Sequence, residues 1–289
     1  MFLEALKENG RTIQEHLDSF LSSWEDLPVI HAMRHALTGG KKLRAFMVIE
    51  SAAVFSVPRT QAIWPASAIE TIHAYSLVHD DLPCMDDDDL RRGLPTIHRK
   101  WDEATAVLTG DALQSLGFEL VLNSACSPRA AIRSELALGL ARAAGAQGMV
   151  LGQALDIAAE SSNSSLNIKE VTALQSAKTG ALFRWSATCG AILAEADPEP
   201  LRVYADAVGL AFQITDDVLD VLGDQEKAGK RLKKDETAGK ATFVSLLGLE
   251  NAQSHAKALI ETACDAVSPL GTGADTLKEL AHFIISRDR

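Results

Sequence analysis

Two groups of aspartate residues carry most of the chemistry that this sequence offers. The first places six carboxylates within ten residues, at Asp80, Asp81, Asp86, Asp87, Asp88 and Asp89. Like charges this close repel one another, so a folded chain tolerates them where solvent or cations are near. Residues 69–79 have the pattern of a helix that Pro83 ends, which places Asp80 at the helix end and Asp86 on the chain that follows. The two can therefore converge on one cation, and ligands that are all oxygen favour Mg²⁺.

An acidic loop that binds nothing is the alternative interpretation of this cluster, because loops are rich in aspartate. Arg91 and Arg92 follow it directly. Cations beside carboxylates suit a site that holds a polyanion, such as a diphosphate, between metal ions and guanidinium groups. The two arginines therefore favour a binding site over an idle loop.

The second group of aspartates lies at residues 213–220, in the sequence QITDDVLD. On a helix, Gln213, Asp216 and Asp220 share one face, and the two aspartates stand one turn apart. The flanking residues are mostly apolar, so this is a charged stripe on an otherwise buried helix. A stripe that merely faces solvent fits poorly, since the helix has little other polar surface.

Several basic residues could hold an anion near these carboxylates. The segment GGKKLR at 39–44 is expected to open a helix, with Lys41 and Arg44 on one face and backbone N–H groups that attract anions. His73 lies two helical turns before Asp80 on the same face. Lys178, Thr179 and Lys230 add further groups that suit phosphate. Each of these residues alone would be unremarkable, and only their combination with the aspartates predicts a site.

Composition narrows the class of protein. The 289 residues carry a net charge of −11, which argues against binding driven by general attraction to nucleic acid or anionic lipid. Cys84, Cys126, Cys189 and Cys264 form no CxxC pair, so we expect reduced thiols and a cytoplasmic location. No apolar run is long enough to span a membrane, and no signal peptide is evident at the N-terminus.

The elements that must position these residues are predicted to be helices. Apolar residues recur at helical spacing through most of the chain, and alternating strand patterns are absent. The breaks between them predict about ten helices, several of them apolar over wide arcs, as expected for surrounded helices or a subunit interface. None of the breaks is long enough for a linker, so we expect one all-α domain over residues 1–289.

At this point the sequence resembles the trans-polyprenyl diphosphate synthases, and within them the bacterial farnesyl diphosphate synthases. The matching segments follow the family order and span 39 to 243. They are GGKKLR (39–44), IHAYSLVHDDLPCMDDDDLRRGLPTIH (72–98), AVLTGDALQ (106–114), GMVLGQALD (148–156), AKTGALFR (177–184), GLAFQITDDVLDVLGD (209–224) and GKATF (239–243).

The resemblance implies an isoprenoid-synthase-type helical bundle around a central cavity, a homodimer, and three Mg²⁺ ions held by the two aspartate motifs. Asp80, Asp86 and Asp216 match its metal ligands, and Asp81, Asp217 and Asp220 match further positions of the same motifs. Lys41, Arg44, His73 and Arg92 match its isopentenyl diphosphate site. Residues matching the groups around the allylic diphosphate are Arg91, Lys178, Thr179, Gln213 and Lys230. Those expected to act in catalysis are Asp80, Asp86, Arg91, Lys178, Asp216 and Lys230.

The implied reaction is the head-to-tail condensation of isopentenyl diphosphate with dimethylallyl or geranyl diphosphate. Tyr75 and Ser76 match the positions that limit chain length in the family, and together with the long first motif they indicate farnesyl diphosphate as product. Geranyl and geranylgeranyl diphosphate remain alternative products. Departures from the family pattern are Lys42 for a frequent arginine, Lys234 for a frequent glycine, and Phe243-Val244 for a common Tyr-Pro; the last two concern closure of the loop after the second motif.

Three other classes of protein share some of these features. A terpene cyclase shares the fold and the metal-triggered ionisation, but it lacks a second-substrate site such as GGKKLR with His73. A non-catalytic regulatory subunit of a synthase typically degrades one aspartate motif, and both are intact here. An HD-type phosphohydrolase, suggested by His79-Asp80, needs further histidine ligands that this chain does not supply at helical spacing.

Overall fold

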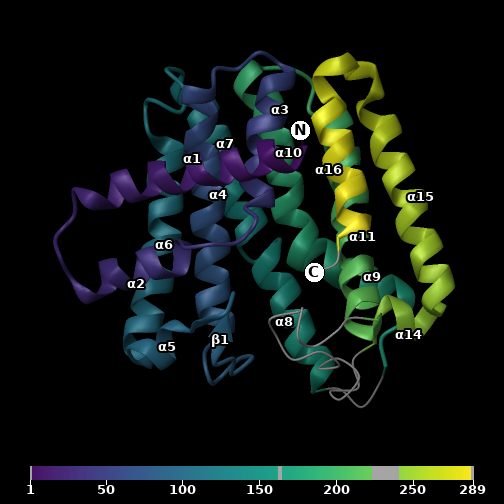
Figure 1. Cartoon of the computed structure of the whole chain (residues 1–289), viewed down its shortest axis with the longest axis horizontal. Coiled ribbons are helices and arrows are strands. Elements are labelled where there is room, and N and C mark those ends of the chain that lie inside the picture. The colour runs from purple at the N-terminus through teal and green to yellow at the C-terminus, as the bar shows by residue number, and fades with distance from the viewer. Residues whose placement is uncertain (1, 162–164, 223–240, 288–289) are drawn as a thin grey trace.

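Helices make up nearly all the regular structure of the chain, as the sequence predicts (Figure 1). The computed structural model describes residues 2–161, 165–222 and 241–287. In the described part, twelve α-helices have eight or more residues, somewhat more than the ten expected. The α-helices are α1 (Phe2–Ser22), α2 (Pro28–Leu37), α3 (Leu43–Val54), α4 (Arg59–Asp80), α5 (Ile97–Lys100), α6 (Glu103–Leu122), α7 (Ala130–Ala144), α8 (Met149–Glu160), α9 (Ile168–Gln175), α10 (Ala181–Ala194), α11 (Glu199–Leu222), α14 (Phe243–Leu247), α15 (Leu249–Val267) and α16 (Asp275–Ser286). A π-helical turn, η1 (Ser176–Gly180), joins α9 to α10, and a 3₁₀ segment, η2 (Ser268–Ala274), joins α15 to α16.

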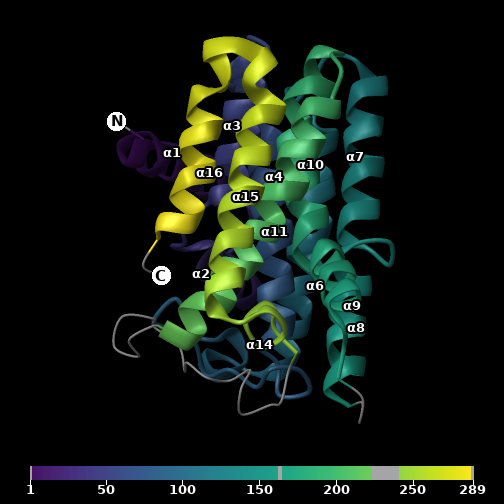
Figure 2. The ribbon, with the colours of Figure 1, turned by 90° about the vertical axis from the view of Figure 1, so that its right-hand side faces the viewer.

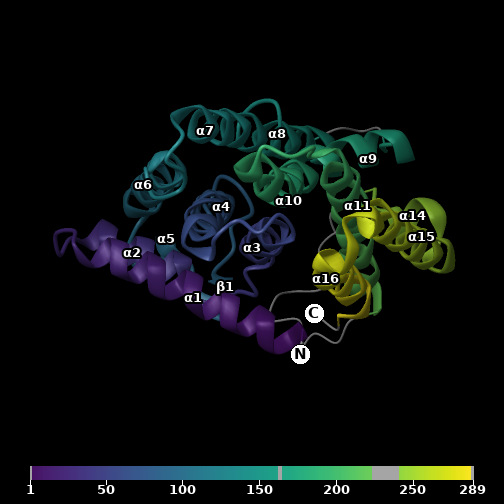
Figure 3. The ribbon, with the colours of Figure 1, turned by 90° about the horizontal axis from the view of Figure 1, so that it is seen from above.

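Helix α4 occupies the middle of the bundle. Figure 3, seen from above, shows it surrounded by α1, α3, α6 and α10. Its buried residues, from Ala62 to Val78, lie on every side of the helix, which is what a sequence apolar over a wide arc requires. Such a helix gains its stability from burial on all faces, because each fully buried apolar side chain contributes about 1.5–3 kcal/mol. Its C-terminal end at Asp80 therefore has a rigid base.

Close helix contacts depend on small residues where two backbones meet. Gly190 of α10 packs on the backbone of Ser51 in α3, and a side chain there would overlap that backbone. Gly209 of α11 lies against the Cα of Gly180 in η1, and a Cβ there would come within 3.3 Å of that Cα, a tight contact without overlap. The second contact holds α11 next to η1, which brings two of the predicted site segments together.

Helices α11, α15 and α16 form a second layer beside α3 and α10 (Figure 2). Their packing buries Tyr204 completely, and its hydroxyl donates a hydrogen bond of 2.7 Å to the carbonyl of Leu277 in α16. Burial of a phenol without such a partner would be costly, so this bond fixes α16 on α11.

Two very short strands interrupt the helical pattern, and the sequence does not predict them. Strand β1 (Leu90–Arg91) pairs with β2 (Leu94–Pro95) in antiparallel register, with Arg91 opposite Leu94. The turn between them has positive φ at Arg92 (+55°) and Gly93 (+76°). Two residues with positive φ give a tight turn that matches the twist of a hairpin. The hairpin follows the first aspartate cluster and folds Arg91 back toward it, while Arg92 reaches the loop before α3.

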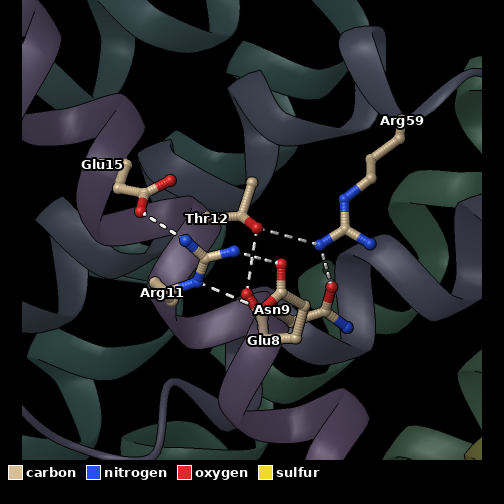
Figure 4. A network of polar contacts seen from close by, with 6 residues as sticks. All are labelled: Glu8, Asn9, Arg11, Thr12, Glu15 and Arg59. Atoms are coloured by element: carbon tan, nitrogen blue, oxygen red, sulfur yellow. Dashed lines mark hydrogen bonds and ion pairs between the residues drawn. The ribbon is translucent and has the colours of Figure 1, made fainter.

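Helix α1 crosses the bundle and is attached by polar contacts (Figure 4). On its outer face Arg11 bridges Glu8 and Glu15 at 2.7 and 2.9 Å. At its inner face the buried Asn9 accepts a hydrogen bond from Arg59 at the start of α4 and donates one of 2.9 Å to Glu50 of α3. The exposed pairs contribute little, but the buried amide orients α1 over α3 and α4.

Among the described residues, no helix is long and apolar enough to cross a membrane.

Candidate active site

A cavity of about 530 Å³ opens beside the C-terminal half of α4. Its wall combines charged groups with apolar side chains. Such a lining suits a ligand that has a charged head group and a hydrocarbon chain. Lining residues include Arg44, His73, Asp80, Lys178 and Thr179 among the polar ones, and Tyr75, Leu82, Met85, Val107, Met149, Val150, Ile157 and Leu182 among the others. Seven of the sequence-predicted site residues thus meet at one cavity, because Tyr75 and Ser76 line it as well.

The first aspartate motif begins where α4 ends, as Pro83 predicts. After Asp80 the chain turns back on itself, and the N–H of Asp86 donates a hydrogen bond of 2.8 Å to the carbonyl of Asp80. The two carboxylates are close enough that Asp86 disfavours the ionised form of Asp80. Burial, and then the neighbouring carboxylates, raise the pKa of Asp80 from 3.8 to about 6, although Lys178 and Arg91 oppose this. A carboxylate in this state gains from a cation nearby.

Asp81 faces the other way and is already paired. Its buried carboxylate accepts two hydrogen bonds from Arg91, one of them at 2.9 Å from Nε, and Arg91 also contacts Asp88 at 3.2 Å. Both hydrogen bonds end on the same carboxylate oxygen, Oδ1, and charge-assisted hydrogen bonds of this kind are stronger than neutral ones. Asp81 therefore orients Arg91. Asp80 lines the cavity, whereas the Asp81 carboxylate is bound to this arginine.

Lys178 lies on the π-helical turn η1 and points into the cavity. Its amino group contacts the carboxylate of Asp156 in α8 at 2.6 Å, and its charge also acts on Asp80. Gly152 of α8 packs on the backbone of Lys178, where any side chain would overlap it. Single π turns within helices are often found at functional sites. Here the turn carries Lys178 and Thr179 to the cavity wall.

A cluster of cations lies at the start of α3. Arg44 is the second residue of this helix, and its guanidinium stacks 4.9 Å from the ring centre of Phe183. Its buried Nε lacks a hydrogen-bond partner among the described residues. Burial lowers the pKa of Arg44 to about 10, which still leaves it charged at neutral pH. A buried, charged donor with an unused N–H is prepared for an anion.

The expectation for Lys41 is wrong in one respect. Helix α3 begins at Leu43, so Lys41 precedes it and does not share a helical face with Arg44. Positive φ values at Gly39, Gly40 and Lys42 turn the chain before the helix begins. Lys41 instead lies with its amino group 5.3 Å from the ring centre of Phe283 in α16.

The N-terminus of α3 is also less open to an external anion than predicted. The buried carboxylate of Glu70 in α4 accepts a hydrogen bond of 3.1 Å from the N–H of Ala45. The same carboxylate attracts Arg44, Lys42 and Arg92. Glu70 thus attracts three basic side chains with a single negative charge. The net charge of this cluster is therefore positive.

Lys42 and Arg92 support this cluster from the loop side. The buried amino group of Lys42 donates a hydrogen bond of 2.9 Å to the carbonyl of Leu37, so the residue that departs from the family pattern holds the loop before α3. Arg92 lies over Gly40 and donates hydrogen bonds to the carbonyls of Thr38 (3.2 Å) and Gly39 (3.3 Å).

His73 lines the cavity on the same side of α4 as Asp80, as its spacing predicts. Burial and four surrounding cations, of which Arg44 acts most strongly, hold the pKa of His73 well below 6.5. The imidazole is therefore neutral at pH 7. An anion bound among these cations would offset part of that effect.

The second aspartate motif lies near the end of α11, but its carboxylates have different neighbours. Asp216 accepts a hydrogen bond of 2.6 Å from Arg287, which follows α16 and also stacks 3.7 Å from the ring centre of Phe212. Asp217 accepts one of 2.7 Å from the N–H of Phe243 at the start of α14. Gln213 and Asp220 lie on α11 with intermediate exposure. The charged stripe is therefore present, with Asp216 already beside a cation.

The two candidate chain-length residues lie on the cavity wall. Tyr75 is buried, and its hydroxyl makes no hydrogen bond that meets normal geometry among the described residues. Burial, and then Asp80, raise the pKa of this phenol, while the Gln114 side chain acts in the opposite direction. Ser76 donates a hydrogen bond of 2.9 Å to the carbonyl of His73.

Some predicted residues lie outside the described part of the chain. They are Lys230 and Lys234, which fall between the described residues 222 and 241. Phe243 is described: it is buried, and its N–H binds Asp217. In the described residues, no three His, Cys, Asp or Glu side chains are close enough together to hold a metal ion. The aspartates thus offer oxygen ligands without forming a complete protein cage.

Three residues of the site escape the sequence analysis. Glu70 could have been found, because it is a lone acidic residue in the apolar run of α4. Asp156 lies in the segment GMVLGQALD, and its sequence position alone does not indicate a contact with Lys178. Arg287 gives no local signal, because its partner Asp216 is 71 residues away.

Comparisons with known proteins agree with this geometry. The family model described as polyprenyl synthetase matches residues 28–269. A farnesyl diphosphate synthase from Escherichia coli is 45% identical, covering 100% of this chain and 99% of the relative. A crystal structure of an FPP/GFPP synthase from Zymomonas mobilis superposes with a TM-score of 0.88 at 43% identity, covering 96% of this chain and 98% of that one. A Helicobacter pylori geranyltransferase, complexed with magnesium and isoprenyl diphosphate, gives a TM-score of 0.81 at 33% identity, with coverage of 99% and 96%.

Proposed function

The chain belongs to the polyprenyl synthetase family and is a prenyltransferase, and we propose that it condenses isopentenyl diphosphate with geranyl or dimethylallyl diphosphate to give farnesyl diphosphate. One observation carries this proposal. The cavity has a carboxylate at Asp80, cations at Lys178 and Arg44, and apolar walls between α4, α6 and α8. This combination suits two diphosphate heads and a hydrocarbon chain.

The residues present fit Mg²⁺. Asp80 and Asp86 supply oxygen ligands whose mutual repulsion a divalent cation would relieve. Mg²⁺ commonly uses one or two carboxylates together with substrate phosphates, which agrees with the incomplete cage. Asp80 and Asp86 would hold metal from the first motif and Asp216 from the second, with Asp220, Asp217 and Asp81 as further candidates. Three ions in all remain part of the proposal.

Each charged group then has a task during ionisation of the allylic substrate. When bound, Mg²⁺ supplies Lewis acidity at the diphosphate oxygens. Lys178 and Arg91 add positive charge on the side where negative charge grows as the C–O bond breaks. Asp156 and Asp81 keep these two cations oriented through their ion pairs. Thr179, Gln213 and Lys230 are proposed to complete the surroundings of this diphosphate.

The second substrate is proposed to bind at the start of α3. Arg44, Arg92 and Lys41 would contact the diphosphate of isopentenyl diphosphate, together with the neutral His73. The double bond then attacks the allylic cation, a C–C bond forms, and a proton is lost. We assign the proton to the released diphosphate, since it stays close by in the cavity. Apolar walls exclude water that would react with the cation.

Product length is proposed to depend on Tyr75. Its ring lies on the cavity wall, and its neighbour Ser76 stands one turn before Asp80 on α4. A chain that grows away from the aspartates would meet this ring. Further elongation then stops, which favours the fifteen-carbon product.

The proposal includes a homodimer of single-domain subunits in the cytoplasm. Large apolar side chains are exposed near the cavity, at Val107 and Leu108 of α6 and at Val150, Leu151 and Leu155 of α8. Such a surface is typical of an interface, and a second copy would cover it. All four cysteines are free thiols, which agrees with a reducing compartment.

The test measures diphosphate release with each substrate alone and with both. The proposal expects release only when isopentenyl and geranyl diphosphates are both present with Mg²⁺, and none when a chelator is added. Release from geranyl diphosphate alone would indicate a terpene cyclase. Absence of turnover in every combination would favour a regulatory subunit and overturn the proposal.

A further inference from the structure

His79 is packed into a notch on the neighbouring helix. Its ring lies against Gly110 of α6, where even a methyl group would overlap the imidazole. Nε2 lies 3.2 Å from the carbonyl oxygen of Val107, so this nitrogen carries the hydrogen and donates it. Both contacts fix the ring on the side of α6.

The notch belongs to a longer contact between α4 and α6. Gly117 lies two turns after Gly110, and a methyl group there would approach Ile72 to 2.8 Å. Ile72 lies two turns before His79. The two glycines therefore make separate close contacts along the same helix pair, Gly110 with His79 and Gly117 with Ile72.

The other side of the ring supports Tyr75. The two rings meet edge to face, with 5.8 Å between centroids and an interplanar angle of 77°. Both residues line the cavity. Because His79 is held on α6 by Gly110 and Val107, the Tyr75 ring has no room to turn toward His79, and it stays at the cavity wall with Gln114 of α6 also acting on its hydroxyl.

We infer that His79 is a positioning residue for product length: the contact of its ring with Gly110 holds Tyr75 where it limits the growing chain. This inference rests on the proposed chain elongation. It assigns the limit to two helices together: Tyr75 of α4 would meet the product, and its neighbour His79 is held in place by α6.

The test compares products of His79→Ala, Gly110→Ala and the double variant. His79→Ala gives Tyr75 room to move, so the ratio of twenty-carbon to fifteen-carbon product rises at least about tenfold, the discrimination typical of small steric changes in a pocket. Gly110→Ala pushes the ring toward Tyr75 and shifts the product the opposite way, toward ten carbons from dimethylallyl diphosphate. The double variant follows His79→Ala.

Gly117→Ala is the matched control, because it disturbs the same helix pair away from His79. Its product length stays that of the wild type, and an equal shift in this control would overturn the inference. So would a wild-type product from an active His79→Ala variant.

Thermal unfolding tests the contact without using activity. Removal of the ring relieves the overlap, so the double variant melts at a higher temperature than Gly110→Ala. An equal or lower melting temperature would mean that the His79 ring does not pack against Gly110, which also overturns the inference. If the wild type makes no elongated product while the melts behave as expected, it is the proposed function that fails.

Discussion

Asp80 is expected to destabilise the protein as long as no metal is bound. Burial and nearby carboxylates raise its pKa from 3.8 to about 6, and the difference corresponds to about 3 kcal/mol of lost stability once the group is ionised in both states. Asn has the same shape without the charge. Asp80→Asn is therefore expected to raise the free energy of unfolding in a chelator by up to about 3 kcal/mol at pH 8.

The pH dependence gives this prediction its sign. The folded-state pKa is raised, so the folded protein binds more protons than the unfolded chain between pH 3.8 and about 6. The advantage of Asp80→Asn is near zero below this window, about half its full value at pH 5, and complete above it. Subtracting the wild-type curve removes the contribution of every other titrating group.

Urea unfolding, followed by tryptophan fluorescence between pH 4 and 8 in a chelator, measures this difference. Asp265→Asn, in the exposed part of α15, is the control and stays within about 0.5 kcal/mol of the wild type. In Mg²⁺ at a thousandfold excess over the dissociation constant the order reverses, because the wild type then gains about 4.1 kcal/mol. An Asn variant that is less stable than the wild type at pH 8 without metal, or a difference independent of pH, would refute the reasoning.

Three further predictions follow from single contacts. Lys178→Ala lowers kcat about 100- to 1,000-fold, the usual loss for one group that stabilises developing charge, and an unchanged rate in steady-state kinetics would contradict its role. Tyr75→Ala extends the product beyond fifteen carbons, as seen by mass spectrometry of the dephosphorylated alcohols; the same length as the wild type would mean that another residue forms the limit. Arg287→Ala releases Asp216 from its 2.6 Å contact and lowers the Mg²⁺ concentration needed for half-maximal activity, whereas the exposed Arg202→Ala leaves it unchanged; a higher requirement would show that Arg287 assists the metal site.

Much of the site follows from local sequence rules. Pro83 ends α4 close to Asp80, so the position of the first carboxylates at a helix end is predictable. The helical period places His73 and Asp80 on one face, and both reach the cavity. These features depend on neighbours within two or three turns, which the sequence displays directly.

Contacts between distant segments could not be predicted in this way. The carboxylate of Glu70 reaches the N-terminus of α3 across 25 residues, and it occupies a donor that would otherwise attract an external anion. The left-handed residues before α3 move Lys41 off the helix, although only the glycines among them signal such a turn. The chemistry of each residue can be predicted from its type, whereas its partners depend on how the helices pack.

Identification of the product tests the central claim most directly. The purified protein would be incubated with Mg²⁺, isopentenyl diphosphate and geranyl diphosphate, and the alcohols identified by mass after dephosphorylation. Farnesol as the dominant product is the predicted result, since the cavity beside α4 then accepts one addition and ends at Tyr75. Geranylgeraniol would contradict the limit at Tyr75, and a cyclic hydrocarbon or no product would contradict chain elongation itself.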